Sequence, residues 1–419
     1  MPLQSLKGFE DILPAQSLKW QAVEAIARRT AELYNYGEIR TPVLESSDVY
    51  HRGVGETSDM VRKETYTFAD RDGDSITMRP EGTAGAARAV IEAGLLNDQG
   101  ARAKVYYIAS NFRHERPQKG RLRQHHQFGI EAYGIAGPEQ DAECVLLQLH
   151  FYQSCGLRDL ALRVNSLGDA DSKQRYGEAL RTFFSPKAES LSPDSQRRLT
   201  ENPLRILDSK DPRDIAACEG VPSSVESLSE ASRLHFDRFV QLLKSANVTF
   251  EVDAKLVRGF DYYTGVLWEV TAGGLGSQNA VGGGGRYDNL VAQLGGRSTP
   301  AVGFGSGLER LLIALDAQGV KLPVPERKLV WLAHHGDAAR DANLALAAEL
   351  RSAGVAVDMD LAGRNIKAQF KAADREQARY VLVTGDDELA AGVVNFKDST
   401  TREQTKIARS EIVEKLAAK

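Results

Sequence analysis

The segment from Asn111 to Glu131 constrains the fold of this chain more than any other, because two apolar runs enclose a strongly basic turn. Aromatic and apolar residues lead into it at Val105–Ile108 and follow its middle from Phe128 onward, which predicts two strands. The stretch between them, Arg116–Arg123, is rich in Pro, Gly, Lys and Arg, a composition typical of an exposed turn. We therefore expect a β-hairpin with cations at its tip.

One face of this hairpin is predicted to be polar. Side chains two residues apart share a face of a strand, so Gln127, Gly129 and Glu131 should point together, with His125 beside them. Phe128 would face a core on the other side. The missing side chain at Gly129 leaves room for a ligand on the polar face. A solvated sheet face with a charged turn explains the same pattern, and this stretch alone leaves both interpretations open.

A second hairpin is predicted upstream, where Thr65–Phe68 and Ser75–Met78 alternate around a DRDGD turn. It leads into the sequence RPEGT and then into a helix over Ala84–Ala93. Glu81 and Thr83 therefore stand at a strand-to-helix junction, where side chains often face a site. Taken alone, capping of the helix is the simpler role for both residues.

The length and the patterning indicate several domains. A chain of 419 residues exceeds what one hydrophobic core normally organises, so two or three domains are expected. Residues 166–247 have the pattern of charged helices, which predicts a helical insertion in a larger sheet domain, and strands should resume at Thr249–Leu256. Beyond a linker at Leu322–Glu326, strands and helices alternate, which predicts a separate α/β domain with a largely parallel sheet.

The composition narrows the function classes. A net charge of -4 argues against a protein that coats nucleic acid non-specifically, although it permits a local basic patch. The three cysteines form no CxxC pair, which suggests reduced thiols in the cytoplasm. The N-terminus has no apolar signal region and no run reaches membrane-spanning length, so we expect a cytoplasmic, unanchored protein.

Two glycine-rich segments lie late in the first domain. Val281–Asp288 contains four consecutive glycines and either lets backbone approach a ligand or turns tightly. Val302–Gly307 runs into a helix with Arg310 in its first turn, where backbone donors bind anions well. Neither segment has the GxGxxG or GK[ST] spacing, so neither a Rossmann nor a P-loop site is predicted.

Four arginines from separate segments suggest the chemistry, namely Arg113, Arg121, Arg258 and Arg310. Arginine stays charged and binds phosphate bidentately, so this set around one cleft would suit a polyphosphate with a second anion. Two unit charges about 4 Å apart repel by roughly 4 kcal/mol at an effective dielectric near 20, so a carboxylate that attacks a phosphate needs such cations. Acyl-adenylate formation is the reaction that these arginines suggest.

The same segments resemble a known family. FRHERPQKGRLRQHHQFGIE is similar to motif 2 of class II aminoacyl-tRNA synthetases, GFGSGLERL to motif 3, and the strand ending at Pro42 to the motif 1 dimer element. LVRGFDYYT and GSQNAVGGGGRYDNL resemble the two histidine signatures of the histidyl-tRNA synthetase family, and RPEGT and NPLRILDSK resemble other stretches of it. The likeness covers nearly the whole chain.

This resemblance implies a fold and its boundaries. Residues 1–325 would form an α+β catalytic domain of the class II type with a mainly antiparallel sheet, carrying a helical insertion at 167–248. Residues 326–419 would form an α/β anticodon-binding domain. The motif 1 element implies a homodimer.

The resemblance also implies roles residue by residue. ATP would be bound by Arg113, Glu115, Arg121, His125 and Arg310. Histidine would be bound by Glu81, Thr83, Gln127, Glu131, Arg258, Tyr262, Tyr263 and Tyr287. Arg113 and Arg258 would be catalytic, and tRNA would contact Gln118, Asn365, Lys367 and Gln369. Mg²⁺ would accompany ATP, and no protein ligand is assigned to it. Position 125 departs from the family pattern, in which a phenylalanine stacking on adenine is expected.

The implied reaction is ATP-dependent ligation of L-histidine to tRNA(His) through a histidyl-adenylate, with release of AMP and pyrophosphate. The main alternative is the synthetase-like, histidine-binding regulatory subunit of ATP phosphoribosyltransferase. Such a protein would lack the C-terminal domain and the arginine signatures, all of which are present here. A tRNA-binding sensor without catalysis would need extra domains, for which this length leaves no room.

Overall fold

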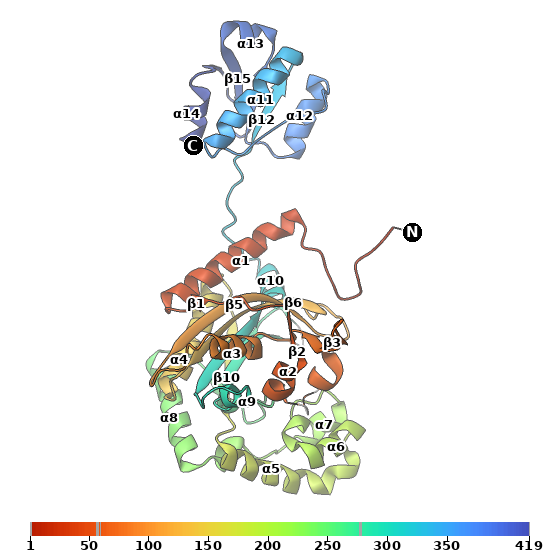
Figure 1. Ribbon diagram of the computed structural model, residues 1–419, viewed down its shortest axis with the longest axis vertical. Coiled ribbons are helices and arrows are strands. Elements are labelled where there is room, and N and C mark those ends of the chain that lie inside the picture. The colour runs from red at the N-terminus through yellow and green to blue at the C-terminus, as the bar shows by residue number, and fades with distance from the viewer. Residues whose placement is uncertain (1, 56–57, 59, 276–278, 419) are drawn as a thin grey trace. The chain divides into compact units, whose positions relative to one another are not determined.

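The computed structural model describes residues 2–55, 58, 60–275 and 279–418 (Figure 1). Residues 276–278, which begin the second histidine signature, lie outside this described part. The chain divides into two compact units, Met1–Pro323 and Val324–Lys419, and each is described by itself below.

The first unit is built on an eight-stranded sheet in the order β1-β5-β6-β11-β10-β9-β7-β8. The two edge pairs, β1 with β5 and β7 with β8, are parallel, and all inner pairs are antiparallel. The predicted mainly antiparallel α+β domain is therefore confirmed. The strand bounds are β1 Gly37–Glu38, β5 Ala103–Phe112, β6 Gln124–Tyr133, β7 Leu160–Ser166, β8 Glu251–Val252, β9 Thr264–Ala272, β10 Ala280–Arg286 and β11 Ala301–Gly307.

The hairpin around the basic turn is confirmed as β5 and β6. Its register runs from Ala103 opposite Tyr133 to Phe112 opposite Gln124, and the loop between the strands carries the cations. The strand predicted at Thr249–Leu256 is shorter than expected, because the chain leaves the sheet after Val252 through a turn in which Leu256 N donates to the Asp253 carbonyl. Among the described residues, β8 lies at the sheet edge and pairs with β7.

Helices cover one face of this sheet and enclose the main core. They are α1 Pro14–Leu33, α4 Pro138–Ser154, α8 Glu230–Ser245 and α10 Leu308–Ala317. The alternation of β6 sends Phe128 into this core, where its ring meets Phe151 at 4.8 Å and Phe304 at 5.8 Å between centroids. Trp268 of β9 is fully buried there. Burial of these rings fixes which face of each strand points the other way, toward the site.

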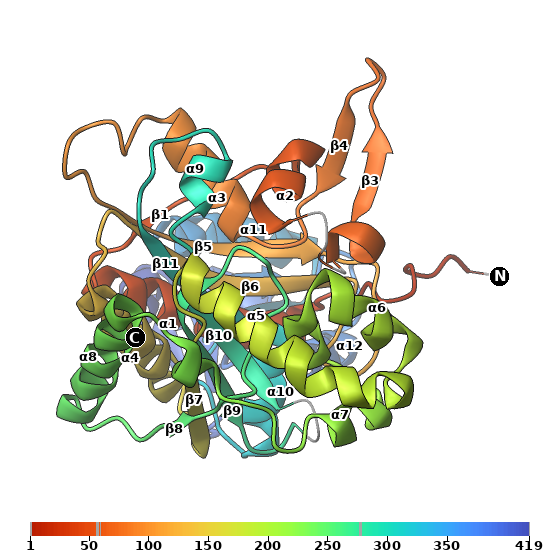
Figure 2. The same cartoon turned by 90° about the horizontal axis from the view of Figure 1, so that it is seen from below.

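The opposite face of the sheet carries the smaller sheet and several shorter helices (Figure 2). A three-stranded sheet in the order β2-β4-β3 lies beside short helices on this side. Their bounds are β2 Leu44–Ser46, β3 Tyr66–Ala69, β4 Ser75–Met78, α2 Ser47–Val54, η1 Met60–Glu64, α3 Thr83–Glu92 and α9 Leu290–Gln293. The predicted hairpin and helix around RPEGT are thus confirmed.

A helical segment separates β7 from β8. Residues 167–250, all of which the structure describes, contain no strand. The segment consists of α5 Ala170–Phe184, η2 Ser185–Ser190, α6 Pro193–Glu201, η3 Pro203–Ile206, α7 Pro212–Ala217, η4 Ser224–Ser227 and α8. Helices α5 to α7 lie on the site side of the sheet (Figure 2).

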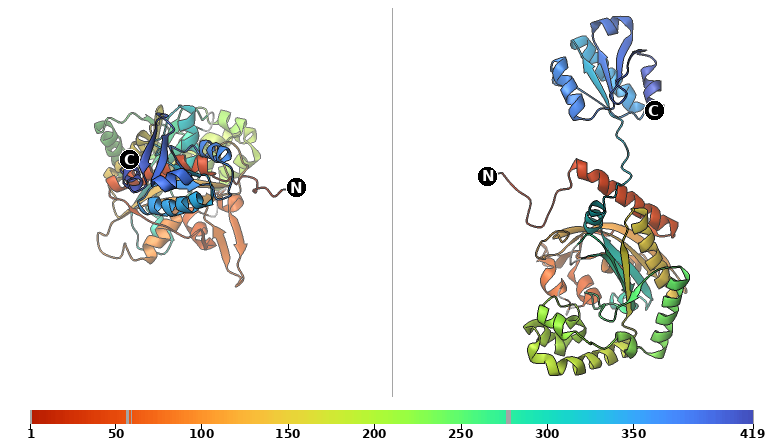
Figure 3. Two further views of the ribbon diagram at one scale, coloured as in Figure 1. Left: turned by 90° about the horizontal axis from the view of Figure 1, so that it is seen from above. Right: turned by 180° about the vertical axis from the view of Figure 1, so that it is seen from behind.

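The second unit, blue in Figure 3, is a five-stranded sheet in the order β13-β12-β14-β15-β16, flanked by helices. Strands β13, β12 and β14 are parallel, whereas β15 and β16 are antiparallel, so the prediction of a largely parallel sheet is wrong for the last two strands. The short turn after Asp398 permits only a hairpin. The bounds are β12 Val330–His334, α11 Asp337–Ser352, β13 Val357–Met359, α12 Ile366–Arg375, β14 Tyr380–Thr384, α13 Asp386–Ala391, β15 Val393–Asp398, β16 Gln404–Ala408 and α14 Ile412–Ala417.

Within the described residues, no helix combines the length and the apolar character needed to cross a membrane.

Candidate active site

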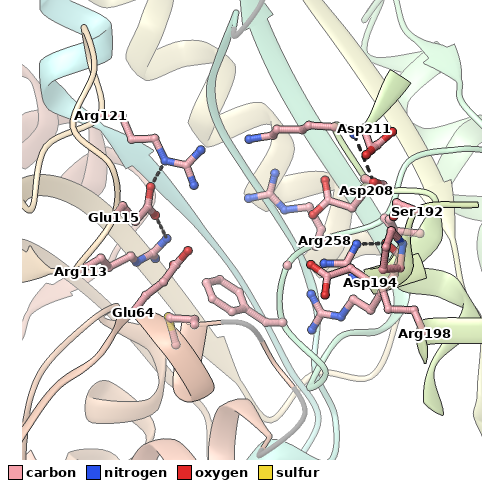
Figure 4. A pocket seen from close by; sticks show the side chains of 18 of the residues that line it. Glu64, Arg113, Glu115, Arg121, Ser192, Asp194, Arg198, Asp208, Asp211 and Arg258 are labelled. Atoms are coloured by element: carbon pink, nitrogen blue, oxygen red, sulfur yellow. Dashed lines mark hydrogen bonds and ion pairs between the residues drawn. The ribbon is translucent and has the colours of Figure 1, made fainter. Parts of the chain in front are cut away.

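A cleft lies between the β5–β6 loop and the helical segment (Figure 4). It consists of two adjoining cavities of about 740 and 480 Å³. Arg113, Glu115 and Arg121 lie on one side, the helical segment presents Asp208 on the other, and Arg258 lies between them. The residues that line both cavities are Arg113, Glu115, Arg121, Asp208, Lys210, Arg258 and Glu269. All four predicted arginines therefore line this highly charged cleft, three of them in both cavities and Arg310 in the smaller one.

The β5–β6 loop is held by its own charges. Arg113 leaves the end of β5 and its Nε donates to the Pro80 carbonyl at 2.8 Å. Glu115 pairs with Arg121 across the loop and lies 3.9 Å from an Arg113 nitrogen. The carboxylate thus positions two guanidinium groups toward the cleft while balancing part of their charge.

Arg258 comes from the irregular segment that precedes β9. Its Nη1 lies 3.2 Å from the Glu269 carboxylate on that strand. A Cβ on Gly283 would lie 2.9 Å from the same nitrogen, so the glycine makes room for the guanidinium. The tight turn expected for the glycine run was wrong, because Gly282–Gly285 form most of strand β10 in the middle of the sheet. The other interpretation, that backbone approaches a ligand there, stays a prediction, and Gly282 lines the smaller cavity. Gly285 likewise makes room for the ring of Tyr263.

Arg310 lies in the first turn of α10, as predicted, and lines the smaller cavity. Its Nε donates to the Gly120 carbonyl and its Nη1 to the Ala280 carbonyl, both at 3.0 Å. Burial, together with the like charge of Arg121, lowers the pKa of Arg310. An anion between the two guanidinium groups would relieve this repulsion, which makes the smaller cavity a suitable polyphosphate site.

Glu131 is fully buried behind this cleft at the end of three hydrogen bonds. Thr83 Oγ1 donates to its carboxylate at 2.9 Å, Tyr107 Oη at 3.0 Å, and Tyr287 Oη donates to the second oxygen. Burial raises the pKa of Glu131 to about 8, although these three donors oppose the shift. A carboxyl group that can either donate or accept a hydrogen bond near neutral pH is suited to binding a polar ring.

Two roles were predicted for Glu81 and Thr83, capping of a helix and facing a site, and each residue has one of them. Glu81 caps α3, because its carboxylate oxygens accept from the backbone N–H of Thr83 at 2.6 Å and of Ala84 at 2.8 Å. Thr83 instead turns its hydroxyl to Glu131. Burial raises the pKa of Glu81, so the cap itself places a second buried carboxyl beside Glu131.

Three tyrosines complete this buried cluster. The Tyr262 ring lies 4.7 Å from that of Tyr263 and 5.5 Å from that of Tyr287, between centroids. Phe260 stacks on Tyr262 at 5.2 Å, and the Arg113 guanidinium lies 5.6 Å from the Phe260 ring. This stack of rings joins the buried cluster to the cationic cleft.

The gap predicted at Gly129 does not accommodate a ligand. A Cβ on Gly129 or on Gly82 would overlap the ring of Tyr107, so that ring fills the space between the two glycines. Tyr107 lies directly opposite Gly129 in the β5–β6 register, and its hydroxyl reaches Glu131 from there. Glycine is needed at position 129 because the ring of Tyr107 fills the space above it, not because a substrate lies there.

The structure therefore sorts the predicted residues into two adjoining groups. Those in the cleft are Arg113, Glu115, Arg121, His125, Gln127, Arg258 and Arg310. Those in the buried cluster are Glu81, Thr83, Glu131, Tyr262, Tyr263 and Tyr287. Gln127 links the groups, since it lines the smaller cavity on the same strand face as Glu131 and accepts from Asn111 Nδ2 at 2.7 Å.

Sequence reasoning missed several residues of this region. They are Tyr107, Asn111, Asp208, Lys210 and Glu269. Strand register would have indicated the first two, because Tyr107 pairs with Gly129 and Asn111 with His125. Asp208 and Lys210 belong to the NPLRILDSK stretch, whose proximity to the sheet depends on the path of the whole helical segment.

The predicted tRNA contacts lie in different settings. Gln118 is exposed on the β5–β6 loop. In the second unit Lys367 is exposed, and Asn365 caps α12 by accepting from Ala368 N at 3.0 Å. The prediction for Gln369 is corrected: the side chain is 1% exposed, and its amide bonds to the backbone of His334 in both directions, at 2.9 and 3.0 Å. Gln369 joins α12 to β12.

No group of three or more His, Cys, Asp or Glu side chains able to hold a metal ion occurs in the part of the chain that the structure describes.

A mainly antiparallel sheet, with Arg113 after the first strand of a hairpin and Arg310 in the first turn of the helix that follows β11, has the architecture of a class II aminoacyl-tRNA synthetase. The family model described as Histidyl-tRNA synthetase matches residues 8–311, and the Anticodon binding domain model matches residues 328–419. The chain belongs to the histidyl-tRNA synthetase family.

Similar proteins match over their whole length. The chain is 46% identical to a histidine–tRNA ligase of Streptococcus thermophilus over 418 residues, covering 100% of this chain and 98% of the relative. It is 44% identical to that of Bacillus subtilis over 414 residues, covering 98% of each. The apo crystal structure of the S. aureus histidyl-tRNA synthetase superposes with a TM-score of 0.84 at 35% identity, covering 99% of this chain and 100% of that one.

Proposed function

We propose that this chain joins L-histidine to tRNA(His) with ATP, through a histidyl-adenylate, and releases AMP and pyrophosphate. The observation that carries the proposal is the contact between a cleft lined by arginines and a buried carboxyl–tyrosine cluster on one sheet face. Full-length similarity to proteins named histidine–tRNA ligase supports it. The regulatory-subunit alternative is not favoured, because the arginines and the second unit are both present.

The cleft would hold ATP and the reacting groups. Arg113 would bind the α-phosphate and Arg310 the γ-phosphate, with Glu115 and Arg121 beside them. Arg258 would lie between the histidine carboxylate and the α-phosphate and stabilise the charge that develops there, so no covalent enzyme intermediate is needed. Mg²⁺ would arrive with the nucleotide and be held chiefly by its phosphates and by water.

The adenine ring would stack on His125 in the smaller cavity. Burial, followed by the charge of Arg113, holds the pKa of His125 well below its usual range. The imidazole is therefore neutral near pH 7 and offers a flat aromatic surface that adds no further cation to the cleft.

The buried cluster would select histidine. Glu131 and Tyr263 would bind the two ring nitrogens, supported by Tyr262 and Tyr287, while Glu81, Thr83 and Gln127 would hold the α-amino end. A substrate without these ring nitrogens would leave buried polar groups unpaired, a penalty that reaches about 10⁴-fold. In this structure the hydroxyls of Tyr107 and Tyr287 donate to the Glu131 carboxyl. Histidine would replace some of these hydrogen bonds when it binds.

The remaining partners are proposed at the level of regions. Residues 1–325 would form the catalytic domain, with an insertion at 167–248 over the tRNA acceptor arm and Gln118 near its end. Residues 326–419 would read the anticodon, with Asn365 and Lys367 on the contacting side. A homodimer would cover the surface beyond Pro42, where Val43 is 40% and Leu44 49% exposed. Three buried free cysteines suit a reducing cytoplasm.

Histidine-dependent exchange of pyrophosphate into ATP tests the central proposal. The wild-type protein should catalyse exchange with histidine and not with other amino acids. A protein that binds histidine yet shows neither exchange nor tRNA charging would support the regulatory alternative and overturn ours.

Removal of the second unit separates the two substrates. Because Met1–Pro323 is compact by itself, a chain ending at Pro325 should retain exchange at nearly the wild-type rate but charge tRNA poorly. Unchanged charging by this shortened chain would contradict the anticodon role.

A further inference from the structure

The segment from Arg258 to Tyr263 contains no regular secondary structure, although it supplies a catalytic arginine and two tyrosines of the buried cluster. Its side chains need a fixed backbone, since a shift of about 1 Å in reacting groups can reduce a rate by 10²-fold. Sheet pairing does not supply this order, because β9 begins only at Thr264. Other contacts must position the segment.

The helical segment provides two of these contacts, from two separate places. Arg205 in η3 binds the Asp261 carboxylate through Nη2 at 2.7 Å. The side chains of this pair are 12% and 26% exposed, so the pair is largely shielded from water. Lys173 in α5 donates its ammonium to the backbone carbonyl of Tyr263, and burial lowers the pKa of Lys173. Both bonds are made to residues between Arg258 and the start of β9.

The same helical segment also faces the cleft. Arg205 and Asp208 both line the larger cavity, and Lys210 lines both cavities. A displacement of η3 would thus act at once on the cleft wall and, through Asp261, on the segment that carries Arg258. In contrast, the pairs made by Arg197 on α6 remain within that helix and are about half exposed.

We propose that Arg205 is a positioning residue for amino-acid activation: by holding Asp261 it fixes Arg258 and Tyr263 in the orientation that binds histidine, with Lys173 as a second tether. This inference rests on the function proposed above for Arg258 and Tyr263. It gives the helical segment a role in forming the adenylate, in addition to covering the acceptor arm. The ATP contacts on the β5–β6 loop and α10 come from outside the tethered segment, which touches them through Phe260 beside Arg113, so the tether should affect KM for ATP less than it affects histidine.

The test compares Arg205→Gln, Arg205→Lys, Asp261→Asn and the double Arg205→Gln/Asp261→Asn variant of the full-length protein. Pyrophosphate exchange is measured against histidine and against ATP separately. We expect Arg205→Gln to lower kcat/KM for histidine by about tenfold, within the range of coupling through a shared ion pair, and to change KM for ATP by less than about twofold. Arg205→Lys should recover part of the loss, because it keeps one charged bond.

The double variant should be no worse than the worse single variant, since each single change already breaks the pair. Arg197→Gln serves as the matched control in the same helical segment and should resemble the wild type. The proposal would be overturned if KM for ATP changed as much as kcat/KM for histidine, or if Arg205→Lys recovered none of the loss. Additive losses in the double variant would overturn it as well.

Folding is checked by thermal melting, and Asp261→Asn provides the test if Arg205→Gln does not fold. Arg258→Ala distinguishes the two levels of failure. If Arg258→Ala abolishes exchange while Arg205→Gln matches the control, only the positioning role is wrong. If Arg258→Ala retains the wild-type rate, the function assigned to the segment is itself wrong.

Discussion

The cleft and the buried cluster handle charge in opposite ways. In the cleft, arginines lie beside carboxylates in open space, as Arg258 lies beside Glu269 at 3.2 Å. In the cluster, Glu131 is fully buried and surrounded by hydroxyl donors rather than by a cation. The cleft stays cationic because a guanidinium keeps its proton at neutral pH, whereas burial makes the charge of Glu131 depend on pH near neutrality.

This difference matches two tasks on one sheet face. A cleft that stays cationic can bind polyphosphate and stabilise charge in a transition state, but it discriminates poorly among amino acids. A dry cluster with fixed donors and acceptors discriminates strongly, because a wrong side chain leaves them unpaired. Phe260, between Arg113 and Tyr262, is where the two environments meet.

The largest expected effect comes from removing Arg258, one of the cations of the cleft. Arg258→Ala should lower the rate of histidine-dependent exchange by about 10³-fold, because electrostatic stabilisation of the transition state is lost. Exchange kinetics measure this, with Arg197→Ala as an exposed control and circular dichroism as the check on folding. A variant that retains its rate would show that the cleft does not use Arg258 for chemistry.

A smaller effect is expected from the cluster, and only for histidine. Glu131→Gln keeps the size of the side chain and removes the ionisable group, so it should lower kcat/KM for histidine by about 10- to 100-fold, the value of one hydrogen bond to a charged partner. KM for ATP should remain unchanged. Equal losses for both substrates would mean that the cluster supports the cleft rather than reading the amino acid.

The same variant tests the burial of Glu131 through stability. The pKa of Glu131 is raised to about 8 in the folded protein, so the unfolded chain loses this proton first as pH rises. Between the ordinary Glu pKa and about 8, wild-type stability should therefore fall by at most about 1.4 kcal/mol per pH unit through this group. Thermal melting from pH 5 to 8 should show Glu131→Gln gaining on the wild type as pH rises. A constant difference would mean that Glu131 titrates normally.

The sequence was sufficient to predict which residues of β6 share a face, because alternation is a property of one strand alone. Gln127 and Glu131 were found in this way. Their partner Tyr107 depends on register across a loop, and the purpose of Gly129 became clear only when that ring was seen over it. Local pattern cannot supply such information, since it lies in the pairing of two strands.

The structure of the glycine run depends even more strongly on contacts with distant segments. Four consecutive glycines have a low strand propensity, so a turn or a ligand loop was the natural interpretation. Their neighbours decide otherwise: Gly283 and Gly285 face Arg258 and Tyr263, so the strand needs small residues to leave room for the site. Contacts between distant segments override local propensity here.

Replacement of His125 by phenylalanine should show the smallest effect on exchange. It compares an imidazole with a phenyl ring at the same place in the cleft. Its pKa is held well below the usual range by burial and then by Arg113, so near pH 7 it acts as an uncharged ring. His125→Phe should therefore change KM for ATP by less than about threefold, whereas His125→Ala should raise it by about tenfold, the value of one base-stacking contact. Exchange rates measured against ATP at pH 6.5, 7.5 and 8.5 decide the point, because a neutral ring predicts the same ratio of wild type to His125→Phe throughout. A ratio that changes across this range would show that the imidazole titrates and contacts the nucleotide through its charge.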